Sequence, residues 1–547
     1  MGHVIVVGAG IGGMTAAIAA TEAGLAVTLV EKTDRVGGAA AYSGGQAWVG
    51  ANHVAQRMGI ADSVADAIDY VCAAATRDPA SVDVGMCRTW LQAAAQAAHW
   101  LEERAVITWE LIPDYPDYYY PALEGSRASG RYLTGAPFDG RSLGAARAHL
   151  HVSPHFPVGI TYTEMFAWGG MSSKANWDQD LVAKRRADDI LTFGTGIAAA
   201  LYKGVLERGV RVLRGHAAQE LLADGARVNG LVCSTQAGEV VLQGPVILAT
   251  GSHDWSDTYS RQFTGIAADD GGSVAPEGIC GDAMALVAPL GGAAQALPAW
   301  AAPVLPGYKL DSPAFVGDTG YRACFEHCLP HTFLVNQQGQ RFCDDSFHPA
   351  IVAAALETDA AGKPANLPLF MVWDEDHHAR YGLGQTMPGG HYPPGLVSSA
   401  ETLHALAAKL GIDGAGLVAT AERFNTMARD GTDFDFGRGG NLSVRRFRGD
   451  WNRQPNPNMA PVATAPFFGM HLRLLNTGIA AGGVRTDREA RVLRADGSIL
   501  EDVYAVEESA ARTAAGVGYN IGYSLSRAMA FGWIAARHVA RQGLHPA

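Results

Sequence analysis

A glycine-rich turn near the start of the chain has the residue spacing that binds the phosphates of a dinucleotide. Residues 8–13 are GAGIGG, a G-x-G-x-x-G pattern. Glycines at these positions allow a tight turn and a close approach of a pyrophosphate to a helix N-terminus. Glu31 follows 21 residues after Gly10, at the end of a predicted strand, where a carboxylate can accept hydrogen bonds from ribose hydroxyls. The sequence therefore predicts a dinucleotide site that includes Gly8, Gly10, Gly13 and Glu31.

A predicted strand–helix–strand unit would hold this turn in position. Residues 3–7 form an apolar run, residues 11–23 an alanine-rich helical pattern, and residues 26–30 a second apolar run. A strand, a turn, a helix and a strand within about thirty residues are typical of a βαβ unit with parallel strands. The turn thus lies in the structural context that the site requires.

The composition is that of an ordinary globular chain and excludes several classes of function. The 547 residues include 42 Lys and Arg against 54 Asp and Glu, a formal net charge of −12. One hydrophobic core usually supports roughly 250–300 residues, so we expect two or more structural units. An acidic chain without a Lys/Arg-rich block offers no surface for a phosphate backbone, so we expect no nucleic-acid partner. The closest basic cluster, Arg445, Arg446 and Arg448, is interpreted as solvated or internally paired.

Cysteine usage and hydropathy predict a cytoplasmic protein. The seven cysteines are scattered and odd in number, which argues against a disulfide framework and favours a reducing compartment. Cys324 and Cys328 lie near His327 and His331, but this spacing suits no common zinc site, so we predict no metal. No run of about 18 apolar residues and no signal peptide are found, so we expect no membrane span.

The rest of the pattern predicts an α/β chain. Helical patterns occupy residues 194–208, 400–410, 415–427 and 524–541. Strand patterns occupy residues 210–213, 228–233, 239–242 and 245–251. We predict a Rossmann-like nucleotide-binding domain built from both chain ends, residues 1–288 and 455–547, with an inserted α+β catalytic domain at 289–454. The glycines at 194 and 196 are not expected to form a second nucleotide site, because no convincing strand precedes them.

Three further segments resemble the flavin-binding segments of large two-domain flavoproteins. Residues 37–45 resemble the second glycine loop, residues 249–251 (ATG) a later strand motif, and residues 497–510 the segment that contacts the ribityl chain and pyrophosphate. Glu507 stands where that last segment usually has glycine, and a carboxylate there would repel the pyrophosphate. The implied cofactor is FAD, and its predicted ligands are Gly8, Gly10, Gly13, Glu31, Lys32, Gly37, Gly38, Ser43, Gly44, Gly45, Ala249, Thr250, Gly251, Glu508, Ser524 and Leu525.

Over almost its whole length the chain resembles the flavin-dependent 3-ketosteroid dehydrogenases, within the wider fumarate reductase-like flavoprotein group. The segments that carry the resemblance are EKTDRVGGAAAYSGGQAWVG, PFDGRSLG, FLVNQQGQRFCDD, FNTMARDGTDFDFGRGG, PNPNMAPV and RAMAFG. The Asp/Phe/Gly run in the fourth segment is the most specific, because carboxylate reductases of the wider group generally lack it. The resemblance implies an active site where the two domains meet over the isoalloxazine ring.

The resemblance implies desaturation of a cyclic ketone, which needs a carbonyl donor, a base for the α-proton and flavin N5 for the β-hydride. In the family a tyrosine and a glycine backbone N–H near the C-terminus hold the ketone. Ungapped alignment places Gly522 on that glycine and Gly518, not a tyrosine, on the tyrosine position. Tyr519 is adjacent, so we predict that Tyr519 and Gly522 hold the ketone; alternatively, Tyr519 is a packing aromatic in a glycine-rich turn.

The base is the least determined part of the predicted site. The family's base tyrosine should follow the RFCDD element, where this chain has SFHPAI and His348 is the nearest titratable group. His348 is one candidate, because an unperturbed histidine has a pKa near neutrality, about 6.5. The loop PDYPDYYYP at residues 113–121 resembles a family loop with an active-site tyrosine, which makes Tyr119 or Tyr120 the other candidate. The loop could equally be an exposed Pro/Tyr segment.

Two other functions stay open. A fumarate or enoate reductase would clamp a dicarboxylate with arginine and histidine, but no arginine follows the RF element before Arg380; Arg473 and Arg512 are the exceptions to be tested. A non-catalytic flavoprotein is the second alternative. We predict a small neutral cyclic ketone as substrate, either a 3-ketosteroid or a smaller ring such as a cyclohexanone, and a quinone or other electron acceptor.

Overall fold

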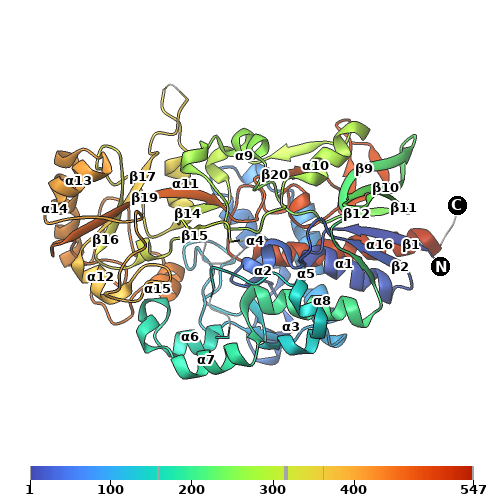
Figure 1. Cartoon of the computed structure of the whole chain (residues 1–547), viewed down its shortest axis with the longest axis horizontal. Helices are drawn as coiled ribbons and strands as arrows, with labels where there is room; N and C mark the ends of the chain where they lie inside the picture. The colour runs from blue at the N-terminus through green and yellow to red at the C-terminus, as the bar shows by residue number, and fades with distance from the viewer. Residues whose placement is uncertain (1, 157–158, 313–317, 361, 545–547) are drawn as a thin grey trace.

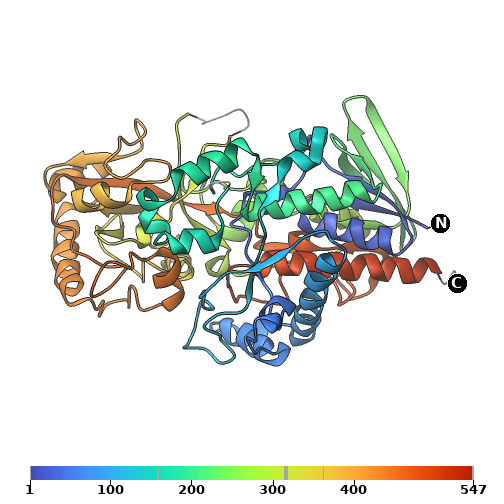
Figure 2. The same ribbon diagram turned by 90° about the horizontal axis from the view of Figure 1, so that it is seen from below.

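The structure is a computed structural model that describes residues 2–156, 159–312, 318–360 and 362–544. The chain forms an elongated molecule with two lobes (Figure 1). One lobe contains both the first and the last part of the chain, and both termini lie at its outer end (Figures 1 and 2). The other lobe is built mainly from the middle of the chain. This arrangement is the one predicted for a nucleotide-binding unit made from both chain ends.

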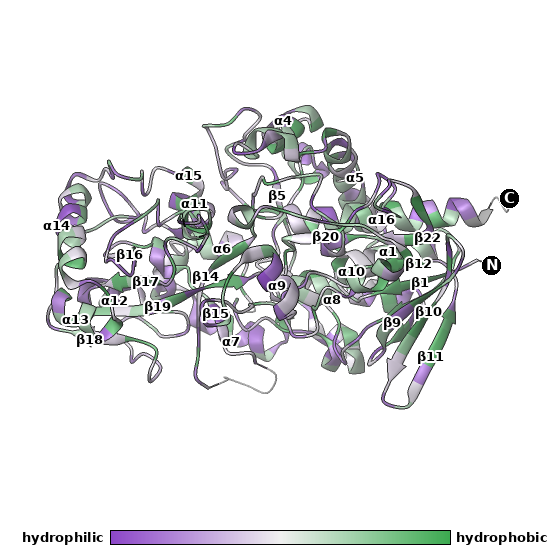
Figure 3. Cartoon of the chain, turned by 90° about the horizontal axis from the view of Figure 1, so that it is seen from above, coloured by the Kyte–Doolittle hydropathy of each residue, from purple (hydrophilic) through white to green (hydrophobic). Residues whose placement is uncertain are grey.

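A nine-stranded sheet with the order β11-β10-β22-β12-β1-β2-β8 forms the centre of the first lobe, with β9 on β10 and β21 on β22. Its strands are β1 (His3–Val7), β2 (Ala26–Val30), β8 (Arg211–Leu213), β9 (Ala217–Asp224), β10 (Arg227–Thr235), β11 (Gly238–Gln243), β12 (Val246–Leu248), β21 (Arg491–Leu493) and β22 (Ile499–Ala505). β1 pairs in parallel with both β2 and β12. The central strands β1 and β12 are apolar (Figure 3), as expected for strands covered on both faces. The α/β class and the Rossmann-like sheet are therefore confirmed.

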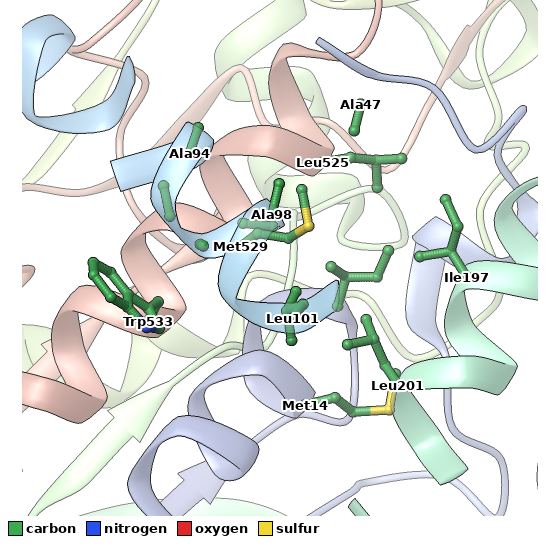
Figure 4. Close-up of a cluster of buried hydrophobic side chains, with 14 of the residues drawn as sticks. Met14, Ala47, Ala94, Ala98, Leu101, Ile197, Leu201, Leu525, Met529 and Trp533 are labelled. Carbon is green, nitrogen blue, oxygen red and sulfur yellow. The ribbon is translucent and has the colours of Figure 1, made fainter. Parts of the chain in front are cut away.

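Four helices pack together beside this sheet, and α1 lies directly on β1, β2 and β12: α1 (Ile11–Glu22), α5 (Val84–Glu103), α8 (Phe193–Glu207) and α16 (Tyr523–Leu544). Their contact is an apolar cluster that includes Met14, Leu101, Leu201 and Met529 (Figure 4). α1 and α16 approach so closely that a Cβ at Gly532 would lie 2.4 Å from the carbonyl oxygen of Gly12. The last helix of the chain thus fixes the first.

The second lobe is built on a six-stranded antiparallel sheet with the order β15-β14-β19-β17-β16, and β18 pairs with β19. Its strands are β14 (Val304–Lys309), β15 (Tyr321–Ala323), β16 (Thr332–Asn336), β17 (Leu369–Trp373), β18 (Ser398–Ala400) and β19 (Phe467–Asn476). Its helices are α11 (His348–Ala355), α12 (Glu375–Tyr381), α13 (Leu403–Leu410), α14 (Gly414–Asp430) and α15 (Leu442–Arg448). The helix expected from residue 400 begins at Leu403, because residues 398–400 form β18.

The remaining elements connect and cover the two sheets. The helices are α2 (Gly38–Tyr42), α3 (His53–Arg57), α4 (Val64–Ala74), α6 (Tyr162–Ala167), α7 (Gln179–Ala187), α9 (Asp257–Thr264) and α10 (Asp282–Val287). The strands are β3 (Ala47–Trp48), β4 (Trp109–Leu111), β5 (Tyr132–Gly135), β6 (Phe138–Asp139), β7 (Ile190–Leu191), β13 (Ala294–Ala296) and β20 (Gly482–Val484). None of the helices that the structure describes has the length and apolar character needed to cross a bilayer.

The connection between the lobes runs through β19. This strand belongs to the second sheet, although it follows residue 455. The chain then returns to the first sheet through β21 and β22. The domain boundaries at 288/289 and 454/455 stay a prediction.

Candidate active site

The predicted glycine turn joins β1 to α1 and presents backbone groups only. α1 follows Gly10, which provides no side-chain cap, and its first turn carries no acidic residue. Gly8 has a φ of 104°, and a Cβ there would lie 2.0 Å from the carbonyl oxygen of Ala249. A Cβ at Gly13 would lie 1.9 Å from the carbonyl oxygen of Gly8. Only glycine fits at these two positions, which lets the backbone of the turn approach a bound phosphate closely.

Glu31 follows β2 and lies beside the glycine turn. Its carboxylate accepts hydrogen bonds from the N–H of Ala9 at 3.0 Å and from the N–H of Thr33 at 2.9 Å. Burial raises the pKa of Glu31. The next residue, Lys32, pairs with Asp282 at 3.1 Å. A fixed carboxylate at the strand end, next to the glycine turn, is the arrangement that holds a ribose.

The second glycine loop packs against the first. The N–H of Gly37 donates to the carbonyl oxygen of Ala9 at 2.8 Å. The first turn of α8, at residues 194–196, packs against this loop, and the hydroxyl of Thr195 donates to the carbonyl oxygen of Ala41 at 2.8 Å. These glycines therefore pack against the expected FAD site.

The C-terminal segment closes the site beside β12. The N–H of Thr250 donates to Oγ of Ser509 at 2.8 Å. Glu508 pairs with Arg527 of α16 at 3.2 Å, and both side chains are 3% exposed. Glu508 also accepts a hydrogen bond from the N–H of Ala480 at 3.0 Å. This buried pair anchors the segment to α16.

One large cavity connects these segments and continues to the junction of the two lobes. The predicted cofactor residues that line it are Gly8, Gly10, Glu31, Lys32, Gly38, Ser43, Gly44, Gly45, Ala249, Thr250, Gly251, Glu508, Ser524 and Leu525. Gly13 and Gly37 do not line it and instead pack against the backbone of Gly8 and Ala9. A glycine-lined cavity with a carboxylate at the strand end fits FAD.

Three aromatic side chains line the same cavity: Tyr118, His348 and Tyr519. The ring centroids of His348 and Tyr519 are 5.1 Å apart, those of Tyr118 and His348 5.7 Å, and those of Tyr118 and Tyr519 6.1 Å. No group in the described part of the chain forms a hydrogen bond with either hydroxyl or with the imidazole. We call these residues the aromatic trio; their polar atoms are available to a ligand.

Gly522 lines the cavity next to the aromatic trio. It has a φ of 87°, and a Cβ there would lie 2.6 Å from the backbone nitrogen of Trp48. Its carbonyl oxygen accepts a hydrogen bond from the N–H of Trp48 at 3.0 Å. Its own N–H has no acceptor within residues 2–156, 159–312, 318–360 and 362–544. Tyr519 and Gly522, both predicted, thus lie at one cavity with free donors.

Asn520 fixes the position of two members of the aromatic trio. Its side chain is buried, and Oδ1 accepts hydrogen bonds from the hydroxyl of Tyr70 at 2.7 Å and from the backbone N–H of Tyr118 at 3.0 Å. Since Asn520 follows Tyr519 directly, these bonds tie the loop of Tyr118 to the loop of Tyr519. Asn520 is therefore a positioning residue.

The charges around the aromatic trio keep His348 neutral. Burial and the neighbouring Arg448 hold the pKa of His348 well below its usual range. Burial raises the pKa of Tyr519, which keeps its hydroxyl protonated. Arg448 itself is 8% exposed and lines the cavity. Of the two interpretations of this segment, the solvated one is wrong for Arg448, because its side chain is buried and donates to Sγ of Cys328 at 3.8 Å.

Unlike Tyr118, the two predicted loop tyrosines, Tyr119 and Tyr120, do not line the large cavity. Tyr119 lines a neighbouring cavity of about 100 Å³ together with His348 and Tyr519. Tyr120 lines neither this cavity nor the larger one. Of the two alternatives for a loop tyrosine, the structure thus brings Tyr119 closer to the aromatic trio.

The candidate zinc residues serve structural hydrogen bonds. Sγ of Cys328 donates to the carbonyl oxygen of Ser346 at 3.2 Å, and Nδ1 of His327 lies 2.7 Å from the carbonyl oxygen of Asp345. Of these residues, His331 lies instead beside Asp374 and Asp376, and one ligand atom of each of the three lies within 4.8 Å of the others. Asp374 already accepts the N–H groups of Ala463, Thr464 and His377. The prediction of no metal remains a prediction.

Sequence reasoning did not identify Tyr118, Asn520 or Arg448. The position of Asn520 between Tyr519 and Gly522 is a signal that could have found it. Tyr118 is one of three consecutive tyrosines, and only its burial distinguishes it. For Arg448 the sequence offers no signal.

Comparison with known proteins agrees with this geometry. The family model described as FAD binding domain matches residues 3–525. The 3-oxosteroid 1-dehydrogenase of Mycobacterium tuberculosis is 29% identical, with 98% of each chain covered. The 4-oxocyclohexanecarboxylate 2-dehydrogenase of Sinomonas cyclohexanicum is 31% identical, covering 98% of this chain and 93% of that protein. The crystal structure of 3-ketosteroid delta1-dehydrogenase from Sterolibacterium denitrificans, in complex with 1,4-androstadiene-3,17-dione, is 29% identical with a TM-score of 0.89, covering 99% of this chain and all of that chain.

Proposed function

Because the chain belongs to the FAD binding domain family, we propose that it is an FAD-dependent dehydrogenase that introduces a carbon–carbon double bond next to the carbonyl of a cyclic ketone. Relatives that cover almost the whole chain act on a 3-oxosteroid and on an oxocyclohexane ring. The observation that carries the proposal is the aromatic trio beside Gly522, which offers hydrogen-bond donors from an apolar wall. The desaturase expected from the sequence agrees with the names of these relatives and with the aromatic trio.

Tyr519 and Gly522 are the proposed carbonyl ligands. The hydroxyl of Tyr519 and the free N–H of Gly522 would donate to the ketone oxygen and stabilise the charge that develops there. Because both donors and the ketone are neutral, binding of the ketone does not require the desolvation of a charged group. Bound FAD supplies the acceptor, at flavin N5, for the hydride that leaves the β-carbon.

The proposed base is either the imidazole of His348 or a loop tyrosine. His348 is neutral, so the lone pair of its imidazole is free to accept the α-proton, although the burial and the Arg448 charge that lower its pKa also weaken it as a base. Tyr118 and Tyr119 lie in the loop that the resemblance singled out, and Tyr118 lines the cofactor cavity. Tyr118 therefore joins the candidates, and Tyr120, which lines neither cavity, becomes the weaker alternative.

Steady-state assays with an artificial electron acceptor test the proposal. The panel consists of 4-androstene-3,17-dione, 4-oxocyclohexanecarboxylate, cyclohexanone and, with a reduced dye, fumarate. We expect oxidation of at least one ketone and no reduction of fumarate. Reduction of fumarate without ketone oxidation would establish the reductase alternative, and no turnover of any kind would favour the non-catalytic flavoprotein.

The Tyr519→Phe variant tests the carbonyl ligand. Removal of one donor to a developing oxyanion lowers kcat by about 10²–10³. Tyr202→Phe is the matched control, because Tyr202 is buried in α8 and lines neither cavity. An unchanged kcat in Tyr519→Phe, with FAD content equal to that of the control, would remove Tyr519 from the proposed mechanism.

We also propose a cytoplasmic location and a quinone as the electron acceptor. All seven cysteines are unpaired, which supports a reducing compartment such as the cytoplasm. A quinone is the acceptor that we propose first, and comparison of a quinone with a flavoprotein acceptor in the same assay tests it.

A further inference from the structure

Glu507 lies directly against the glycine turn that binds the pyrophosphate. Its Oε1 accepts a hydrogen bond from the N–H of Gly12 at 3.2 Å. A Cβ at Gly10 would lie 2.7 Å from the same oxygen. The φ of Glu507 is 61°, in the left-handed region that favours glycine. A glutamate thus stands where the backbone geometry suits glycine, with its side chain at the N-terminus of α1.

The second carboxyl oxygen of Glu507 has no partner. Oε2 is buried and forms no hydrogen bond within the described residues. Leaving a buried polar atom without a partner costs free energy. Glu507 also lines the cofactor cavity together with Gly8, Gly10 and Glu31. A ligand bound at the glycine turn could therefore form a hydrogen bond with Oε2 of Glu507.

The charged groups around Glu507 do not neutralise it. Glu508 and Glu31 are the charges that act on its carboxyl, and both are acidic. Among the cations of this region, Arg527 of α16 pairs with Glu508, Lys32 pairs with Asp282 of α10, and the charge of Arg512 acts on Glu508. No cation that the structure describes is among the groups that shift the pKa of Glu507. The first turn of α1 and the strand β20 carry no charged side chain. Burial, with Glu508 and Glu31 adding to it, raises the pKa of Glu507 to about 8.

We propose that Glu507 is a ligand of the FAD pyrophosphate in its neutral form, with the carboxylic acid O–H donating to a phosphate oxygen. An ionised Glu507 would repel the pyrophosphate at close range, whereas the acid supplies the donor that Oε2 can carry. FAD binding is then coupled to uptake of a proton whenever Glu507 starts ionised. The repulsion expected from the sequence is avoided by protonation.

The pH dependence of FAD affinity tests this proposal. The dissociation constant of FAD for the apoprotein is measured between pH 7 and pH 9.5 by the quenching of flavin fluorescence. Linkage predicts that the constant of the wild type rises by about 30-fold across this range, approaching tenfold per pH unit above the pKa of about 8. Glu507→Gln keeps the shape and one N–H donor but cannot ionise, so its constant should change less than about threefold. Equal pH profiles for the two proteins would overturn the proposal.

Proton uptake gives an independent measurement. Titration calorimetry at pH 8.5 in buffers of different ionisation enthalpy yields the number of protons taken up with FAD. We expect a clear fraction of one proton for the wild type and none for Glu507→Gln. Absence of uptake by the wild type, or a large loss of FAD affinity in Glu507→Gln at pH 7, would overturn the proposal. Absence of FAD binding by both proteins at every pH would instead contradict the family's cofactor.

Discussion

Tyr118, His348 and Tyr519 come from three distant segments, and each keeps its polar atoms free at the cofactor cavity. Their roles separate by chemistry. A protonated tyrosine hydroxyl can donate a hydrogen bond to the carbonyl oxygen, and a neutral imidazole can accept the α-proton. Whether the base is His348 or a loop tyrosine can be decided by single substitutions, because none of these groups holds another protein group by a hydrogen bond in the described structure.

His348 should leave no inflection near its ordinary pKa in the pH profile of the enzyme. Because burial and Arg448 hold the pKa of His348 well below 6.5, the imidazole stays neutral as the pH falls through 6.5. A reaction that needs neutral His348 should therefore keep a constant kcat/KM from about pH 6 to pH 8. The measurement is kcat/KM against pH with the ketone that turns over best. An inflection near pH 6.5 that disappears in His348→Gln would show an ordinary, solvated histidine.

The loop tyrosines can be separated by two matched variants. If Tyr118 is the base, Tyr118→Phe should lower kcat by about 10²–10⁴, the usual contribution of a general base. Tyr120→Phe serves as the control and should leave kcat within about twofold, because Tyr120 lies outside both cavities. Equal kcat values in wild type and Tyr118→Phe would leave His348 or Tyr119 as the base.

At the scale of elements, the Asp/Phe/Gly run after α14 builds the support of the aromatic trio. Asp433 pairs with Arg341 at 2.7 Å, and Arg341 and Arg438 both pair with Asp345 at 2.9 Å. This buried ionic network joins the run to the segment that leads into α11, whose first residue is His348. The residues of this run line neither cavity, so we expect the run to position His348 rather than to contact the substrate.

Asp345→Asn should strongly destabilise the protein. Although burial opposes ionisation, Arg341 and Arg438 hold the pKa of Asp345 well below its usual range. Its stabilisation is therefore present at neutral pH and is lost as the pH falls below about 4. Loss of one partner from a buried pair costs about 3–5 kcal/mol, which urea unfolding at pH 7 would measure.

The matched control for this variant is Asp435→Asn. Asp435 pairs with Arg423, whose side chain is 68% exposed, and exposed pairs contribute about 0–1 kcal/mol. A similar loss of stability in both variants would contradict the special role of the buried network.

The sequence predicted backbone-determined features well and side-chain placement less well. The turn at residues 8–13 and Glu31 could be located because only glycine tolerates the close contacts and only the strand end places a carboxylate there. Tyr118 could not be distinguished from its two tyrosine neighbours, since the fold of an irregular loop decides which ring is buried. Arg448 belongs to a segment interpreted as solvated or internally paired, and only its burial at the end of α15, beside Cys328, makes it a cavity residue.

At the scale of the whole molecule, the cavity is shared by both lobes. Gly8 and Ser524 of the first lobe and His348 and Arg448 of the second line it together. FAD should therefore raise the melting temperature of both lobes in one cooperative transition. At a free concentration of 100 times Kd, the stabilisation is about 2.7 kcal/mol. Differential scanning calorimetry of apoprotein and FAD-loaded protein measures it, and two separate transitions, of which FAD shifts only one, would contradict this prediction.

The position of β22 has a consequence for biosynthesis. Residues 499–505 form a strand between β10 and β12, inside the sheet that carries the glycine turn. A nascent chain on the ribosome cannot complete this sheet until that late strand has left the exit tunnel. Capture of the yellow cofactor must therefore follow translation of residues 499–505, and translation intermediates without them expose the unpaired edges of β10 and β12.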